Sequence, residues 1–254
     1  MAPLNAMLLE LPLLLAAFGF SIAMMGLGGA HIHQWASLQD KIANQSSLPG
    51  FVGVDNNNIT NVDYAIMILG AIQFVFSIFA MLMSCEQLKK RRGEYSGKGT
   101  KAWLVVGLTS LLLLGAWTGV VSAYTAFSTI KFYKFTQGPN YSEPFNTEQQ
   151  LYLRQINYFI QAQITSSLKL VNIPGFPLGE WSNIYTIQEA NAYLNTFNYN
   201  SIFSYRAAVA VGWFQLGSVF LVTVVHFALP FAWRYLNLLR EPKKDPSSRY
   251  NDLM

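Results

Sequence analysis

The chain of 254 residues is 52% hydrophobic and only 12% charged, whereas about 25% of residues are charged in ordinary soluble domains. This composition excludes a single water-soluble globule and favours folding in a bilayer. The formal net charge of +4 does not indicate nucleic-acid binding, because the basic residues concentrate in two segments beside apolar stretches.

Four apolar stretches are long enough to cross a bilayer as helices, which takes about 20 residues each. They are residues 11–29, 64–84, 102–128 and 207–233, and none contains Lys, Arg, Asp or Glu. We predict an all-α membrane protein, a four-transmembrane-helix bundle with a partly helical large extracellular loop. The first stretch is expected to be an uncleaved span, because signal peptides carry basic residues before their apolar core and this one is preceded only by Glu10.

The first connection, the small outer loop 30–63, is rich in turn-forming residues and is expected to be a surface loop without a core. Two Asn-x-Ser/Thr sequons, acceptors of N-glycosylation, begin there at Asn44 and Asn58. A third begins at Asn140, in the large outer loop 129–205. We predict a glycoprotein if the chain passes through a eukaryotic secretory route.

Basic residues predict the orientation, because short cytoplasmic segments carry an excess of Lys and Arg. The connection 85–101 holds six basic residues against two Glu, and the tail 234–254 holds five more basic residues. Both segments, and therefore both termini, are expected in the cytoplasm. There they would attract anionic lipid head groups, at about 1 kcal/mol per nearby basic residue. The expected location is the plasma membrane or an endosomal or secretory membrane.

The large outer loop contains helix signals. The sequence Asn146-Thr147-Glu148-Gln149 can cap a helix, which apolar residues at three- and four-residue steps extend over 147–170. Thr186 and Glu189 form a capping box that opens another helix leading towards span four. The helix of span three is expected to continue through Phe135, because no residue before Gly138 breaks it.

Small residues recur at helix-packing steps within the spans, where they allow two backbones to approach closely. They are Gly19, Ala23, Gly70, Ser77, Gly115, Gly119 and Gly212. The simplest interpretation is that they close the four-helix bundle. The alternative is that they bind other membrane proteins or a second copy of the chain.

Depth counting at about 1.5 Å per residue brings four polar side chains close to mid-membrane. They are Ser21, Gln73, Thr118 and Gln215. We expect hydrogen bonds across the bundle, and the alternative is a layer that lines a permeation path. His226 precedes Pro230 by four residues, which predicts a local kink with a hydrogen-bonded histidine.

No pattern in the chain indicates catalysis. The only cysteine is Cys85, the spans contain no acid pair, and no Gly-x-Ser-x-Gly or phosphate-binding loop occurs. We expect no enzyme, no cofactor and no metal, since His31 and His33 lie far along the bundle from His226. Cys85 is either a palmitoylation site beside the membrane or an ordinary thiol. Tyr250 to Leu253 has the Tyr-x-x-hydrophobic form of a sorting signal.

The four spans, the short first and long second outer loops, the basic inner loop and the juxtamembrane Cys85 together resemble the tetraspanin family. The resemblance is architectural, because the Cys-Cys-Gly motif and loop disulfides of that family are absent. It implies a non-enzymatic scaffold that associates with partner membrane proteins and uses its large outer loop for recognition. The alternatives are a pore or transporter subunit with a mid-membrane polar layer, and an accessory subunit of a membrane enzyme complex.

Overall fold

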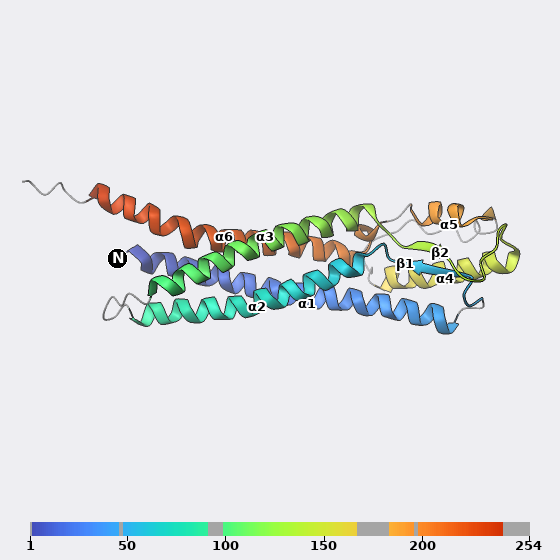
Figure 1. Ribbon diagram of the computed structural model, residues 1–254, viewed down its shortest axis with the longest axis horizontal. Helices are drawn as coiled ribbons and strands as arrows, with labels where there is room; N and C mark the ends of the chain where they lie inside the picture. The colour runs from blue at the N-terminus through green and yellow to red at the C-terminus, as the bar shows by residue number, and fades with distance from the viewer. Residues whose placement is uncertain (1, 46–47, 91–98, 167–182, 196–197, 241–254) are drawn as a thin grey trace, which may run out of the picture.

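The computed structural model describes residues 2–45, 48–90, 99–166, 183–195 and 198–240 (Figure 1). These residues are mostly helical. The helices are α1 (Ala2–Gln45), α2 (Ile59–Lys90), α3 (Gly99–Ile130), α4 (Thr147–Ser166), α5 (Ile187–Leu194) and α6 (Phe203–Arg240), with a 3-10 turn η2 (Tyr199–Ser201). Two short strands, β1 (Val52–Asp55) and β2 (Lys134–Gln137), pair in an antiparallel sheet.

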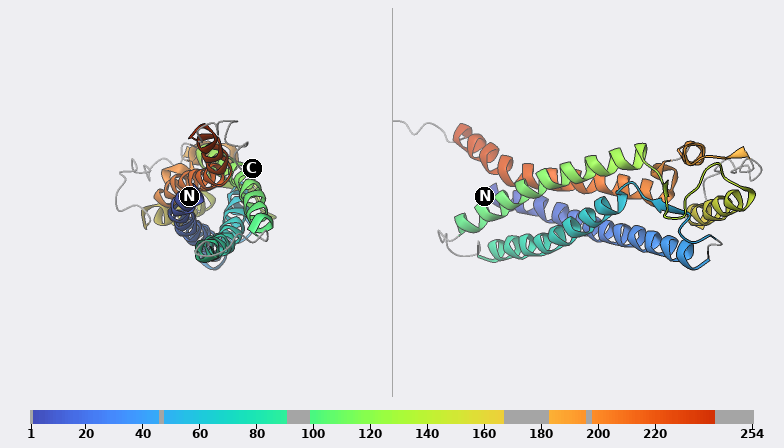
Figure 2. Two further views of the ribbon diagram at one scale, coloured as in Figure 1. Left: turned by 90° about the vertical axis from the view of Figure 1, so that its left-hand side faces the viewer. Right: turned by 45° about the vertical axis from the view of Figure 1, so that its right-hand side comes forward.

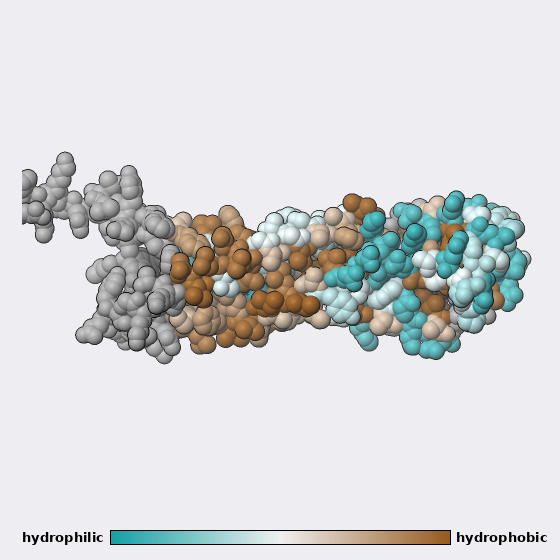
Figure 3. Space-filling view, in the orientation of Figure 1, coloured by the Kyte–Doolittle hydropathy of each residue, from teal (hydrophilic) through white to brown (hydrophobic). Residues whose placement is uncertain are grey.

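Four helices are long and apolar enough to span a membrane, which fits a multi-pass integral membrane protein. The candidate spans are Glu10–Asn44, Ile59–Cys85, Leu104–Ile130 and Phe203–Ala228. Around the bundle α1 packs on α2, α2 on α3, α3 on α6 and α6 back on α1, as the end-on view in Figure 2 shows. In Figure 3 an apolar surface covers these helices and gives way to a polar surface over α4 and α5.

The first helix extends well beyond the predicted span. Its 44 residues correspond to about 66 Å of helix, roughly twice the thickness of a bilayer core. The prediction that residues 30–45 belong to a loop is therefore wrong, because no proline or glycine lies between Gly29 and Pro49 to break the helix. Leu38 and Ile42 are buried in this extension, which packs against α4.

The rest of the small outer loop also has a core, contrary to expectation. Val52 pairs with Gln137 and Asp55 with Lys134, and the side chains of Phe51, Val52 and Val54 are buried. The third span consequently ends at Ile130, and the predicted helical continuation through Phe135 is wrong because this segment forms β2. The two connections approach so closely that a Cβ at Gly138 would lie 2.2 Å from the carbonyl oxygen of Gly50.

Side-chain amides close both edges of this sheet. On β1, Gln39 Nε2 of α1 donates to the Val54 carbonyl at 3.1 Å. On β2, Asn191 of α5 accepts from the Phe135 amide at 2.7 Å and donates to the Phe135 carbonyl at 3.0 Å. Two isolated strands are marginally stable in water, so these bonds and the helices behind them help to hold the sheet.

Beyond the bundle lies a compact unit that we call the head: residues 33–45 of α1, 48–58 and the described parts of 131–202. The predicted helix caps in it are confirmed. The Asn146 side chain accepts from the Gln149 amide at 2.9 Å, and Thr186 and Glu189 cap α5 reciprocally. The last predicted residues of α4, 167–170, lie outside the described residues. The helix α5 ends at Leu194, and η2 separates it from α6.

Candidate functional site

Buried polar side chains follow one face of three long helices. They recur at steps of ten or eleven residues, about three helical turns. They are Glu10, Ser21 and His31 on α1, Asp63, Gln73 and Ser84 on α2, and Tyr205, Gln215 and His226 on α6. The fourth helix, α3, adds Ser110, Trp117 and Tyr124 at steps of seven. All of these residues except Ser84 and Ser110 belong to an outer cluster next to the head, a middle layer or an inner pair.

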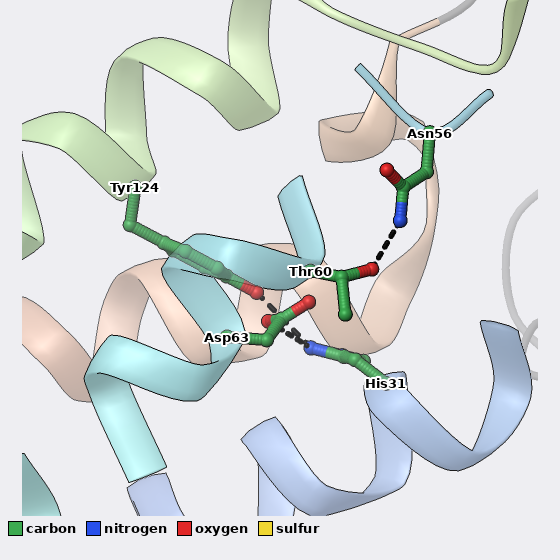
Figure 4. Close-up of polar contacts among 5 residues, drawn as sticks. All are labelled: His31, Asn56, Thr60, Asp63 and Tyr124. Carbon is green, nitrogen blue, oxygen red and sulfur yellow. Dashed lines mark hydrogen bonds and ion pairs between the residues drawn. The ribbon is translucent and has the colours of Figure 1, made fainter. Parts of the chain in front are cut away.

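The outer cluster takes one side chain from each long helix. His31 Nδ1 lies 3.0 Å from Asp63 Oδ1 and 3.1 Å from the Tyr124 hydroxyl (Figure 4). The Tyr205 ring stacks on the His31 ring, with centroids 3.8 Å apart and planes within 5°. His31 and Asp63 are 1% and 0% exposed, so the pair is shielded from solvent on all sides.

The hydrogen bonds of this cluster allow few proton positions. With Asp63 ionised, the imidazole proton belongs on Nδ1, from which it is donated to the carboxylate. The Tyr124 hydroxyl then donates to Asp63, with which it also hydrogen-bonds. Asp63 Oδ2 and His31 Nε2 have no partner among the described residues. A buried acid and histidine held in this way are costly to separate, because each would leave the other unpaired.

Residues of the head cover the outer cluster. The Tyr199 hydroxyl donates to the Asn56 carbonyl at 2.8 Å, and the Tyr199 ring packs 4.9 Å from that of Tyr205. Burial raises the pKa of both Tyr199 and Tyr133, so both hydroxyls stay protonated. Asn56 also bonds the Thr60 hydroxyl at the start of α2 (Figure 4). The cluster therefore joins the four long helices to the head.

The middle layer contains the predicted Gln73 and Ser21 together with Trp117. The Trp117 indole donates to Gln73 Oε1 at 3.2 Å, and Gln73 Nε2 donates to Ser77 at 3.1 Å. Ser21 donates to the carbonyl of Phe18 in its own helix at 2.7 Å. Gln215 is 0% exposed, and neither atom of its amide has a partner among the described residues.

Thr118, which depth counting groups with these residues, does not join the middle layer. Its side chain is exposed on the outside of α3 and donates to the Leu114 carbonyl one turn back in the same helix. Depth alone could not show this, because two residues at one level can lie on opposite faces of a helix. The neighbouring Trp117 occupies the inward position instead.

The inner pair consists of His226 on α6 and Glu10 on α1, with His226 Nδ1 2.9 Å from Glu10 Oε1. Both side chains are buried. Close packing of α3 against this pair requires Gly107, where a Cβ would lie 2.9 Å from His226 Cδ2 and 2.6 Å from Phe227 Cζ. Glu10 and Asp63 both lie within candidate spans, although sequence analysis placed each just outside one.

Apolar side chains separate the three polar levels, which are about 16 Å apart along α1. Leu14 and Ala17 lie between the inner pair and the middle layer, and Met24 lies between the middle layer and the outer cluster. All three are 0% exposed. The bundle is thus packed between its polar levels rather than lined by polar groups throughout.

The predicted packing residues fall into two groups. A Cβ at Gly70 would lie 3.1 Å from the Ser21 carbonyl oxygen, and one at Gly212 would lie 3.3 Å from Val121, so both positions are at helix contacts. Gly19, Gly115 and Gly119 are exposed, and a Cβ there would have no neighbour within 4 Å among the described residues. Ser77 is buried and Ala23 is half-buried.

The remaining predicted sites lie at the surface or outside the described residues. Asn44, Asn58 and Asn140 are exposed, and Cys85 is an exposed free thiol. Tyr250 and Leu253 lie outside the described residues.

Among the residues that the structure describes, no group of three or more His, Cys, Asp or Glu side chains could hold a metal ion. In comparisons with known proteins, no family model, no curated protein and no solved structure matches the chain.

Proposed function

We propose that this protein is a non-enzymatic tetraspan organiser, which binds partner membrane proteins laterally through α3 and presents the head for recognition on the far side of the membrane. Both termini would lie in the cytoplasm. The observation that carries the proposal is an outward face of small residues on α3, formed by Gly115, Gly119, Ser122 and Ala126, all of them exposed.

The position of this face supports a lateral role. Lipid offers no hydrophobic drive for helix association, so spans associate where small residues allow close contact. Within the bundle, Gly70 and Gly212 already provide such contacts. Gly115 and Gly119 contribute to none of these contacts, so the face that they form has no large side chains. The helices of the bundle are already held to one another by polar contacts elsewhere. A partner helix can approach there without any rearrangement.

The head supports the recognition part of the proposal. Leu151 and Tyr158 of α4 are 56% and 60% exposed, and Arg154 is exposed between them. The three residues lie at i, i+3 and i+7, on one face of the helix. Tyr and Arg are enriched at the residues that dominate binding energies in protein interfaces. The likeness to tetraspanins belongs to the same proposal and rests on the four spans together with this ordered head.

A pull-down of the tagged full-length chain in mild detergent, read by mass spectrometry, tests the two surfaces separately. Gly115→Leu with Gly119→Leu should remove lateral partners, and Leu151→Ser with Tyr158→Ser should remove partners of the head. Gly217→Leu is the matched control, because Gly217 is also exposed with no neighbour within 4 Å. Unchanged partners in both double variants would overturn the proposal.

One observation favours a second candidate, a pore or transporter subunit. Ionisable residues within a span often mark ion or proton pathways, and the bundle holds two such pairs, Glu10 with His226 and His31 with Asp63. The packed Leu14, Ala17 and Met24 between them speak against a continuous path. Proton or ion flux into liposomes that contain the purified chain, abolished by Gln73→Leu or Glu10→Gln, would replace the organiser with this candidate.

A further inference from the structure

The three sequons stand at different heights above the bundle. Asn58 directly precedes Ile59, the first residue of a candidate span. Asn44 lies in the last turn of α1, at the far end of the helical extension, and Asn140 follows β2. All three side chains are exposed, so the folded head leaves room for a glycan at each of them.

The fold brings the surroundings of Asn44 and Asn140 together at the tip of the head. The Asn140 amide donates to the Gly50 carbonyl at 3.0 Å, and Asn140 Nδ2 donates to the Pro49 carbonyl at 3.3 Å. Asn44 precedes Pro49 by only five residues along the chain. Two sequons from different outer connections therefore share one end of the molecule.

Asn58 instead belongs to the start of α2. Its backbone amide donates to Asn56 Oδ1 at 3.1 Å, and the hydroxyl of its sequon residue Thr60 is bonded by the Asn56 side chain. The Asn58 backbone has a φ of 64°, in the left-handed region. The Asn58 backbone and the sequon's threonine are thus both tied to the cap that opens the span.

Chain reach distinguishes the sequons even before the head folds. A fully extended chain covers at most about 3.6 Å per residue. Asn58 lies five residues from Asp63 in the outer cluster, so it reaches about 18 Å from that level. Measured from the same level, Asn140 lies sixteen residues beyond Tyr124 and reaches about 58 Å, and Asn44 lies thirteen residues beyond His31 and reaches about 47 Å. Only the last two can move well clear of the lipid head groups.

We propose that Asn44 and Asn140 are N-glycosylated in a eukaryotic secretory membrane and that Asn58 is not. This inference rests on the proposed topology. In the reaction, Nδ2 forms a bond to the anomeric carbon of a lipid-diphosphate-linked oligosaccharide, the bond from that carbon to the diphosphate oxygen breaks, and the Nδ2 proton leaves with the lipid diphosphate. Asn140 Nδ2 keeps one hydrogen after the modification and so retains the capacity to donate to the Pro49 carbonyl.

The consequence is a glycan cap on the tip of the head alone. The side of the head next to the membrane stays uncovered, as do the adjoining ends of α2 and α6, where Tyr64 and Phe203 are exposed, and both are open to lateral partners.

The test is expression of the full chain in mammalian cells, followed by endoglycosidase digestion and gel mobility. Wild type should carry two glycans, Asn44→Gln and Asn140→Gln should each carry one, and Asn58→Gln should match wild type. Peptide mapping after enzymatic deglycosylation, which converts a glycosylated asparagine to aspartate, reports the sites in the unsubstituted chain. A glycan at Asn58, or its absence from Asn44 or Asn140, would overturn the inference.

A separate variant distinguishes this failure from failure of the topology. Leu253→Thr turns the tail sequence Asn251-Asp252-Leu253 into a sequon, far along the chain from span four. Under the proposed topology the variant runs as wild type. A glycan added at Asn251 would place the tail on the luminal side and overturn the topology itself.

Discussion

In the bundle, each long helix satisfies its own backbone, and polar side chains from different helices meet at three levels about 16 Å apart. In the head, the chain depends on contacts between distant segments: β1 pairs with β2, α5 bonds the edge of β2, and α1 packs on α4. In the bundle, the backbone hydrogen bonds of one helix therefore do not depend on those of another helix. Folding of the head is expected to be cooperative, because each of its segments is held by contacts with another segment.

The two regions also differ in what their buried polar groups do. In lipid, a polar side chain that crosses between helices fixes which faces meet, as Gln73 and Trp117 do. In the head, side-chain amides such as those of Gln39 and Asn191 replace missing backbone partners. The outer cluster belongs to both regions. Its side chains come from the four long helices, and Tyr199 and Asn56 of the head cover it.

The largest effect is expected where the two regions join. Asp63→Leu should lower the free energy of unfolding by about 3–5 kcal/mol, because His31 and Tyr124 lose their buried partner. Thermal unfolding of the variant in detergent should show that the bundle and the head unfold together, at a lower temperature than in wild type. Asp63→Asn is the conservative control, since an amide oxygen still accepts from His31 and Tyr124. A Leu variant as stable as wild type would mean that the cluster does not fasten the regions.

A smaller and more local loss is expected in the head. Asn191→Ala should cost about 1–3 kcal/mol, because the amide and carbonyl of Phe135 both lose a partner. Hydrogen exchange should accelerate at the Phe135 amide while the bundle helices stay protected. Gln188→Ala, an exposed position on the same helix, should change nothing. Equal acceleration in the two variants would show that the edge bond is not what holds β2.

The same difference between the regions explains what the sequence could predict. Apolar length predicted the four long helices, and Thr186 with Glu189 predicted the start of α5, since both signals are local. The pairing of Val52–Asp55 with Lys134–Gln137 depends on segments far apart in the chain, and neither segment alone predicts a strand. The extension of α1 beyond Gly29 was not predicted, because the hydropathy falls there although no residue breaks the helix before its end at Gln45.

The candidate site was predicted in part for a similar reason. Depth counting found Ser21, Gln73 and Gln215, but it ignored helix face and so included Thr118. Trp117 was missed because tryptophan was treated as an apolar residue, and the sequence does not show that its indole N–H donates to Gln73. Glu10 and Asp63 lay just outside the apolar stretches. The signal that would have included both is the three-turn step from Ser21 to Glu10 and from Gln73 to Asp63.

Within the bundle, the unpartnered amide of Gln215 gives a prediction of opposite sign. Gln215→Leu should stabilise the protein by about 1 kcal/mol, because it removes a buried polar group without a hydrogen bond. Gln73→Leu is the matched comparison and should destabilise by a similar amount, since the Trp117 indole and Ser77 lose their partner. Thermal midpoints in one detergent test both. A loss of stability in Gln215→Leu would mean that Gln215 has a bonding role in the bundle.

The smallest effect concerns the cap of α5 and depends on pH. Hydrogen bonds from the backbone amides of Tyr185 and Thr186 lower the pKa of Glu189 below its ordinary value of 4.5. A lowered pKa means that the folded state favours the carboxylate, so the stabilisation is complete above the ordinary value and disappears as the pH falls through the lowered one. The effect is modest because Glu189 is fully exposed. Thermal unfolding between about pH 6 and 3 should show it, and Glu189→Gln should remove this part of the pH dependence.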